Sequence, residues 1–250
     1  MSPLSRTVAV AVLTFASGVI GFFLQGLLPL QALTDAKGMV GSITGLVILL
    51  LALVLGLLVW TSYGVYTTQN SESQALGPVI LQADFALEQY GPEARAGRAL
   101  LRDAVVRARE RLWGGKPGAI APYAQARADL ESIAAFFGGL KPADDRQREL
   151  IATARPFFVK VIETTLLMSR QLASPVPKLL LFVVVGWSAL LFLGFGLLNP
   201  FNVVSLAAVA FGSIAVASAI FMILEFSQPY SGVVRISPVG VDNLIATLGR

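Results

Sequence analysis

The stretch MVGSITGLVILLLALVLGLLVW, residues 39–60, is the most informative segment of the chain because it contains no charged side chain. A helix that crosses a lipid bilayer needs about 20 predominantly apolar residues, and this stretch meets that length. Three further segments meet it as well, at residues 7–30, 178–198 and 201–226. The first is too long for the apolar core of a cleaved signal peptide. The sequence therefore predicts an all-α integral membrane protein with four transmembrane helices.

Charge is concentrated between the second and third of these spans. Only 14% of the 250 residues are charged, whereas soluble domains usually have about 25%. Most Lys, Arg, Asp and Glu residues lie in the segment 64–176. We therefore expect a polar insert within a membrane domain, which divides the chain into residues 1–63 (a transmembrane hairpin with spans 7–30 and 39–61), 64–176 (the insert), 177–227 (a second hairpin with spans 178–198 and 201–226) and 228–250 (a C-terminal tail).

Basic residues near the span ends predict the orientation. Four spans place both termini and the insert on one side, and that side has five basic residues near the spans: Arg6, Lys160, Arg170, Lys178 and Arg235. The opposite side has only Lys37. Because Lys and Arg are retained on the cytoplasmic side, we expect the termini and the insert to lie in the cytoplasm.

The insert has the periodicity of several helices. Apolar residues recur at steps of three and four over residues 76–90, 100–112, 123–137 and 150–165. Pro156 should kink or split the last of these helices, and loops are expected at residues 114–118 and 174–177. The segment 100–112 is rich in arginine. Because charged residues on a helix usually form its solvated face, we favour this interpretation over contact with lipid headgroups. The insert has almost as many acidic as basic residues, so no nucleic-acid partner is expected.

Residues that commonly perform catalysis are missing from the sequence. The chain has no His and no Cys, so the commonest general base and the commonest metal ligands are absent. The spans contain no carboxylate pair, and no phosphate-binding glycine motif occurs. We therefore expect no enzymatic activity, no cofactor and no metal site.

Two spans have patterns that suggest specific contacts. The fourth has small residues along one face, which permit close helix packing within one chain or between copies: Ser205, Ala208, Gly212, Ala215 and Ala219. The second continues into a polar but uncharged segment. A helix that lines a pore could have this pattern, and the candidate pore-lining residues are Leu55, Leu58, Ser62, Val65 and Gln69. The alternative is an ordinary helix that extends into the cytoplasm.

The C-terminal third resembles the bestrophin-like family. The resemblance rests on FGLLNPFN at residues 195–202 and on LEFSQPYSGVVRIS at residues 224–237. The most specific part is the turn after the last span, with Pro229, Tyr230 and Gly232. The resemblance implies a pentamer in a bacterial inner membrane, with second spans that line an anion pore. Bestrophins have an acidic calcium-binding cluster after the last span, but Asp242 is the only acidic residue in this tail, so calcium gating is not carried over.

These observations predict a homo-oligomeric ion channel that conducts anions. The alternative is a non-conducting scaffold or signalling protein whose cytoplasmic helices bind a partner. A small-molecule transporter is a third possibility, but the spans offer few polar groups with which to build a cavity at mid-membrane.

Overall fold

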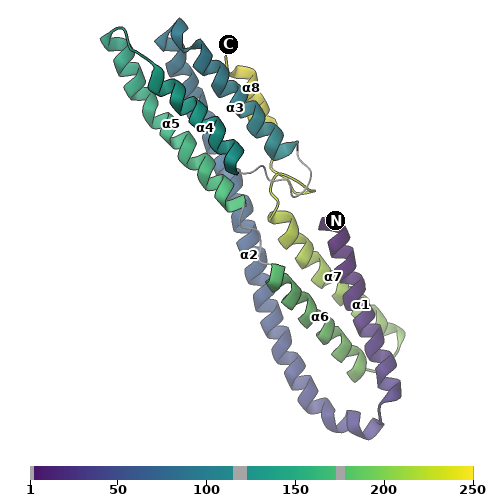
Figure 1. The fold of residues 1–250 in the computed structure, drawn as a ribbon. Helices are drawn as coiled ribbons and strands as arrows, with labels where there is room; N and C mark the ends of the chain where they lie inside the picture. The colour runs from purple at the N-terminus through teal and green to yellow at the C-terminus, as the bar shows by residue number, and fades with distance from the viewer. Residues whose placement is uncertain (1–2, 115–122, 173–177, 250) are drawn as a thin grey trace. The chain divides into compact units, whose positions relative to one another are not determined.

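The computed structural model describes residues 3–114, 123–172 and 178–249, and in these residues the regular structure is helical throughout. Figure 1 shows the helices in chain order. Their bounds are α1 (Pro3–Leu27), α2 (Leu30–Tyr90), the short 3₁₀ helix η1 (Pro92–Ala94), α3 (Arg95–Trp113), α4 (Tyr123–Gly139), α5 (Asp145–Leu172), α6 (Lys178–Leu198), α7 (Val203–Phe226) and α8 (Val239–Thr247). Four of them, α1, α2, α6 and α7, contain segments long and apolar enough to cross a membrane. The all-α class and the four apolar helices are therefore confirmed.

The second helix differs from its predicted bounds at both ends. A turn was expected at residues 31–38, but α2 already begins at Leu30. The break after α1 lies instead at Leu28 and Pro29, where a proline interrupts the hydrogen-bond pattern of the preceding helix. At the other end α2 continues without a break to Tyr90. Gly91 then has a φ of 124°, which favours glycine, and Pro92 starts η1. The second span and the first helix of the insert are thus one helix.

The predicted bounds of the later helices agree more closely. α5 ends at Leu172, just before the predicted loop at 174–177, and it is one helix that contains Pro156 and is not split. Asn202 caps the N-terminus of α7, because its side chain accepts a hydrogen bond from Ser205 N. Of the predicted loop at 114–118, residues 115–118 lie outside the described residues, as does the whole of the predicted break at 174–177.

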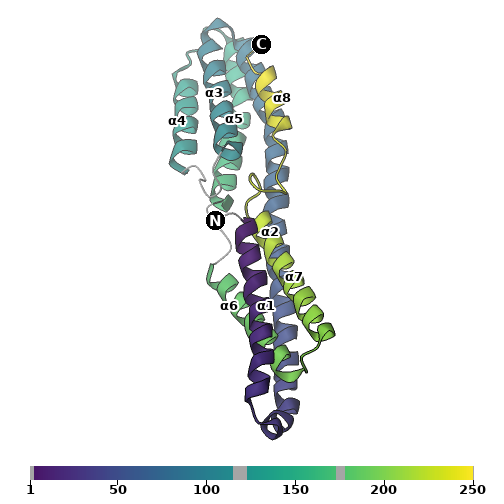
Figure 2. The ribbon, with the colours of Figure 1, turned by 90° about the vertical axis from the view of Figure 1, so that its right-hand side faces the viewer.

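The chain divides into two compact units. The span unit comprises Met1–Gly64 and Val176–Ser227, and the insert unit comprises Val65–Pro175 and Gln228–Arg250. In the span unit α1 packs against α6 and α7, and Figure 2 shows these three helices side by side. Two apolar clusters fill this unit. One is built on Phe22, Phe192 and Val209, and the other includes Leu58, Val184 and Ile223.

Glycines allow a close contact between two helices of the span unit. A Cβ atom placed on Gly196 of α6 would lie 2.1 Å from the carbonyl oxygen of Gly18 in α1, and one on Gly21 would lie 2.2 Å from the carbonyl oxygen of Leu193. Only glycine fits where two helix backbones approach this closely, as small residues allow within membranes.

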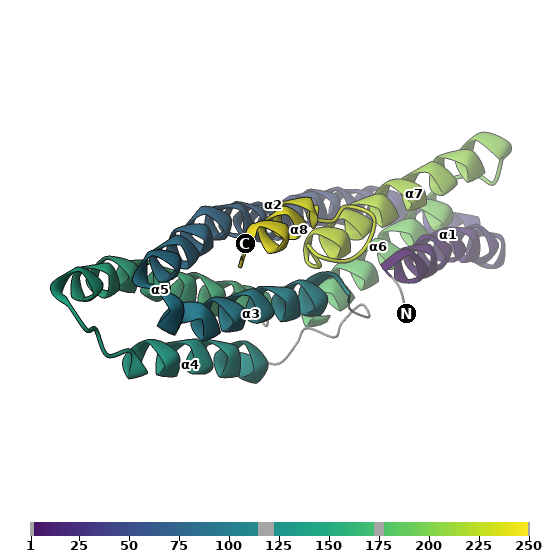
Figure 3. The ribbon, with the colours of Figure 1, turned by 90° about the horizontal axis from the view of Figure 1, so that it is seen from above.

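In the insert unit, α3, α4, α5 and α8 pack around the second part of α2. All five helices contribute to one apolar core, in which Leu87, Leu101, Leu130, Phe158 and Leu244 are buried. α8, from the C-terminal tail, is in contact with α3, and Figure 3 shows it on the same side of the insert unit as the second part of α2. The tail is therefore part of this unit.

Candidate functional site

The predicted pore-lining residues lie on the side of α2 that packs against its own chain. Leu58 is 6%, Ser62 1% and Gln69 0% exposed, while Leu55 and Val65 are half-buried. Leu58 belongs to the apolar cluster formed with α6 and α7. A side chain covered by its own chain cannot face a water path between copies, so the prediction is corrected for Leu58, Ser62 and Gln69.

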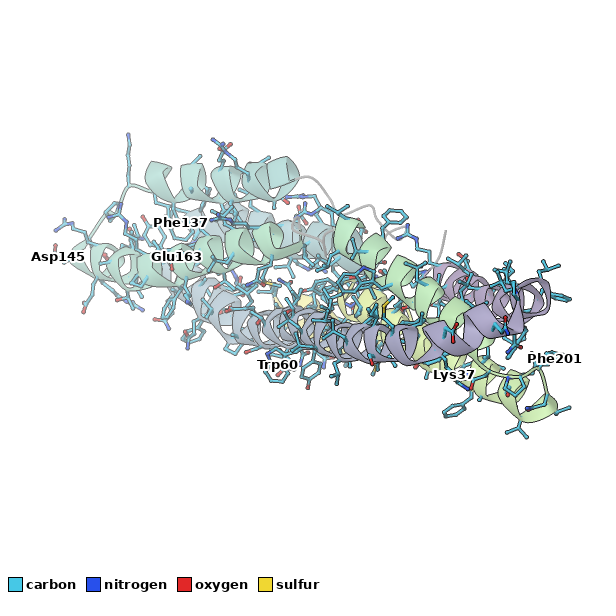
Figure 4. All side chains as sticks on the ribbon, turned by 90° about the horizontal axis from the view of Figure 1, so that it is seen from below. Lys37, Trp60, Phe137, Asp145, Glu163 and Phe201 are labelled. Carbon is cyan, nitrogen blue, oxygen red and sulfur yellow. The ribbon has the colours of Figure 1, made fainter. Side chains whose placement is uncertain are left out.

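The opposite side of α2 is exposed. Because successive residues of an α-helix are about 100° apart, a line of residues at steps of three and four shares one face. Leu53, Leu57 and Trp60 are 67%, 60% and 73% exposed, and Figure 4 shows the region around Trp60. The same line continues through Gly64, Thr67 and Ser71, which are also exposed. No residue between Lys37 and Glu72 is charged. This exposed line changes from apolar to neutral polar side chains along one helix.

Gln69 has a structural role in the insert unit. Its amide nitrogen donates hydrogen bonds to Gln171 Oε1 at 2.7 Å and to the carbonyl oxygen of Met168 at 3.3 Å. Its amide oxygen accepts a hydrogen bond from the hydroxyl of Tyr230 at 3.0 Å. Buried polar groups require such partners. Gln69 therefore connects α2, α5 and the turn after α7.

The turn at Pro229, Tyr230 and Gly232 is well ordered by hydrogen bonds. Ile236 N donates to the carbonyl oxygen of Pro229 at 2.8 Å, and Gly232 has a φ of 98°, in the region that favours glycine. Trp113 of α3 covers this turn. Its ring lies edge-on to Tyr230 with centroids 4.8 Å apart, and its Nε1 donates to the carbonyl oxygen of Ile236 at 2.7 Å. Burial raises the pKa of the Tyr230 hydroxyl.

Sequence reasoning identified this turn but not its partners. Gln69, Trp113 and Met168 lie far from Tyr230 in the chain, and neither spacing nor composition connects them. The sequence offered one signal: the neutral amide of Gln69 lies on the same face of α2 as Leu58 and Ser62. This position indicates a buried polar contact only when that face is known to be buried.

The small-residue face predicted for α7 is only partly packed. Ala208 and Ala215 are exposed, and Ser205, Gly212 and Ala219 are half-buried. The buried face of α7 is instead displaced by about one residue, with Val209, Ser213, Ala217 and Ile220. Ala208 and Ala215 therefore do not pack within one chain, and their contact with another copy stays a prediction. The close contact through glycines occurs between α1 and α6, which the sequence reasoning missed.

In the part of the chain that the structure describes, four of the six arginines of α3 form ion pairs with carboxylates from other helices. Arg98 makes two hydrogen bonds to the buried Asp84 of α2, at 2.9 and 3.0 Å, and the bond to this carboxylate raises the pKa of Arg98. Asp129 of α4 forms ion pairs with both Arg107 and Arg111. Asp242, the one acidic residue of the tail, pairs with Arg109 at 2.9 Å. Among the described residues no group of three potential metal ligands occurs.

Comparisons with known proteins agree on one family. A family model described as a bestrophin-like domain matches residues 10–241. Three crystal structures of a bacterial bestrophin homologue from Klebsiella pneumoniae, each with one substitution, match with a TM-score of 0.65. They are 14%, 15% and 14% identical to this chain, and the match covers 98%, 100% and 98% of it and 96% of each of theirs. At this identity the similarity shows the fold alone. No protein with a curated description matches the chain.

Proposed function

This chain belongs to the bestrophin-like family, and from that premise we propose that it forms a homo-oligomeric ion channel for anions, as a pentamer in a bacterial inner membrane. The family and fold are those of channels and not of enzymes. The supporting observation within this chain is the exposed, uncharged line along α2 from Leu53 to Ser71. In a ring of copies, such a line would form the wall of a central path.

The proposed path runs along the exposed side of α2. It replaces the path predicted from the sequence along the side that carries Leu58, Ser62 and Gln69. Leu53 and Leu57 would form apolar rings, which resist wetting and can act as a gate. Thr67 and Ser71 would follow with hydroxyl groups that can replace part of the hydration shell of an ion. The partly exposed small face of α7, with Ala208 and Ala215, is available for contact with a neighbouring copy.

The most direct test places a charge on the proposed path. Thr67→Glu adds one carboxylate per copy, so a ring of negative charge should lower the permeability of chloride relative to potassium several-fold. The matched control is Thr67→Gln, which has the same size without the charge and should keep the anion preference. Reversal potentials in planar bilayers under a KCl gradient measure this ratio, after mass measurement and particle imaging have established the size and symmetry of the purified oligomer.

Two results would contradict the proposal. A monomer would remove the central path, and absence of flux from folded, reconstituted oligomers with several anions would remove conduction. Equal selectivity of the Glu and Gln variants in a conducting oligomer would show instead that the path lies elsewhere, so the position of the pore and the existence of the channel are tested separately.

A further inference from the structure

The insert unit contains a cavity of about 690 Å³ that the proposed channel path does not use. Its walls come from α2, α3, α4, α5 and α8 and from the segment just before α8; the five helices are drawn in Figure 3. Apolar side chains supply most of the lining, among them Ile80, Leu101, Val105, Leu112 and Leu244. Small-molecule sites in proteins are typically about 300–1,000 Å³ and mostly apolar, so the cavity has the volume and the lining of such a site.

Each charged group at the cavity wall has an ion-pair partner. Arg111 lies 2.6 Å from Asp129, and Arg109 lies 2.9 Å from Asp242. The polar groups that remain on the wall are neutral hydroxyls and amides: Asn70, Ser73, Gln74, Thr165, Ser237, Asn243 and Thr247. A charged molecule would lose its hydration on entering and would find no unpaired opposite charge. An uncharged molecule would not incur this cost.

Small residues in the wall account for the open space. Ala104 and Ala108 of α3 line the cavity, as does Gly240 of α8. A Cβ atom placed on Gly240 would meet no atom within 4 Å. The space is partly open to its surroundings. Water that covers its apolar wall is less favourable than an apolar guest that covers the same surface.

We propose that this cavity binds a small, uncharged, mainly apolar molecule with one or two hydrogen-bonding groups. The apolar body lies against α3 and α8, and its polar group contacts the hydroxyls and amides of the wall. Because α8 and Ile236 form one side of the cavity, the bound molecule joins the C-terminal tail to α2 and α3. This inference rests on the insert unit alone and does not depend on ion conduction.

The test uses a neutral photoreactive probe, trifluoromethyl phenyl diazirine, with the full-length assembled protein in lipid nanodiscs. Peptide mass spectrometry after illumination should find labelling in residues 101–113 and 239–247. An excess of a non-photoreactive neutral aromatic of similar size should suppress this labelling, whereas benzoate and phenyltrimethylammonium, which stay charged at neutral pH, should not. Labelling of the apolar spans by probe dissolved in lipid serves as an internal reference.

Variants that fill the cavity distinguish labelling inside the cavity from nonspecific labelling of the protein surface. Gly240→Leu and Ala104→Leu each place a side chain into the space and should remove most of the labelling. The matched control is Ala246→Leu, on the exposed side of α8 and outside the cavity wall, which should label like the unmodified protein. If one filling variant does not fold, the other gives the answer.

Several outcomes would overturn the proposal. Absence of labelling in the assembled protein would mean that a neighbouring copy or another part of the chain fills the space. Labelling that is not saturable, or that persists in both filling variants, would indicate nonspecific adsorption. Stronger competition by benzoate than by the neutral aromatic would mean that the site recognises an anion.

Discussion

At the scale of single residues, the hydroxyl of Tyr230 is the clearest example of a side chain that connects distant parts of the chain. It donates to Gln69, which in turn donates to α5. Tyr230→Phe should lower the free energy of unfolding by about 1–3 kcal/mol, because the amide oxygen of Gln69 loses a buried donor. Denaturant unfolding of the purified protein measures the change. Ser231→Ala in the same turn removes only a partly buried hydroxyl and should have a smaller effect.

Tyr230 also predicts how stability depends on pH. Burial raises the pKa of its hydroxyl in the folded protein above the ordinary value of 10.0. Stability from this group is therefore fully present below pH 10 and is lost as the pH rises through the higher folded pKa. The denaturant concentration at the midpoint of unfolding should decrease as the pH rises above 10. This decrease should be less steep in Tyr230→Phe than in the unmodified protein. An equal slope in the two proteins would assign the dependence to other groups.

At the scale of elements, the packing of α1 against α6 depends on backbone contact. Gly196→Ala would place a methyl group 2.1 Å from the carbonyl oxygen of Gly18, so the two helices would have to separate. We expect the free energy of unfolding to decrease by several kcal/mol, as it does for other severe steric changes in a packed core. Thermal unfolding in detergent checks this prediction.

A second glycine of α6 provides the control. A Cβ on Gly186 would meet nothing within 4 Å, and alanine favours helix more than glycine. Gly186→Ala should therefore leave stability unchanged or raise it slightly. If Gly196→Ala were as stable as Gly186→Ala, the close approach of α1 and α6 would not exist in the folded protein.

At the scale of the whole molecule, the predicted orientation can be tested because the chain has no native cysteine. Single cysteines in place of Lys37 and of Arg148, both exposed, should be labelled from opposite sides by a membrane-impermeant maleimide. We expect Arg148→Cys to react only in inverted vesicles, because the basic residues near the spans favour a cytoplasmic insert. Reaction of Arg148→Cys in intact cells would show that the insert lies outside the cytoplasm and that the predicted orientation is wrong.

The sequence by itself determined the fold class, the four apolar helices and the family resemblance. These properties are local: a segment either is or is not apolar over about 20 residues, and in lipid such a segment must form a helix because its backbone groups have no other partners. The turn with Pro229, Tyr230 and Gly232 could be identified for the same reason, since its residues are adjacent in the chain.

Which side of each helix faces inward became known only from the packing of the helices. In α2 the residues around Leu53 and those around Leu58 are equally apolar, because lipid and the interior of a helix bundle favour the same side chains, so periodicity could not separate the buried face from the exposed one. The partners of Tyr230 and the contact between Gly18 and Gly196 join residues that are far apart in sequence. Their identity depends on how the helices pack, which no local pattern records.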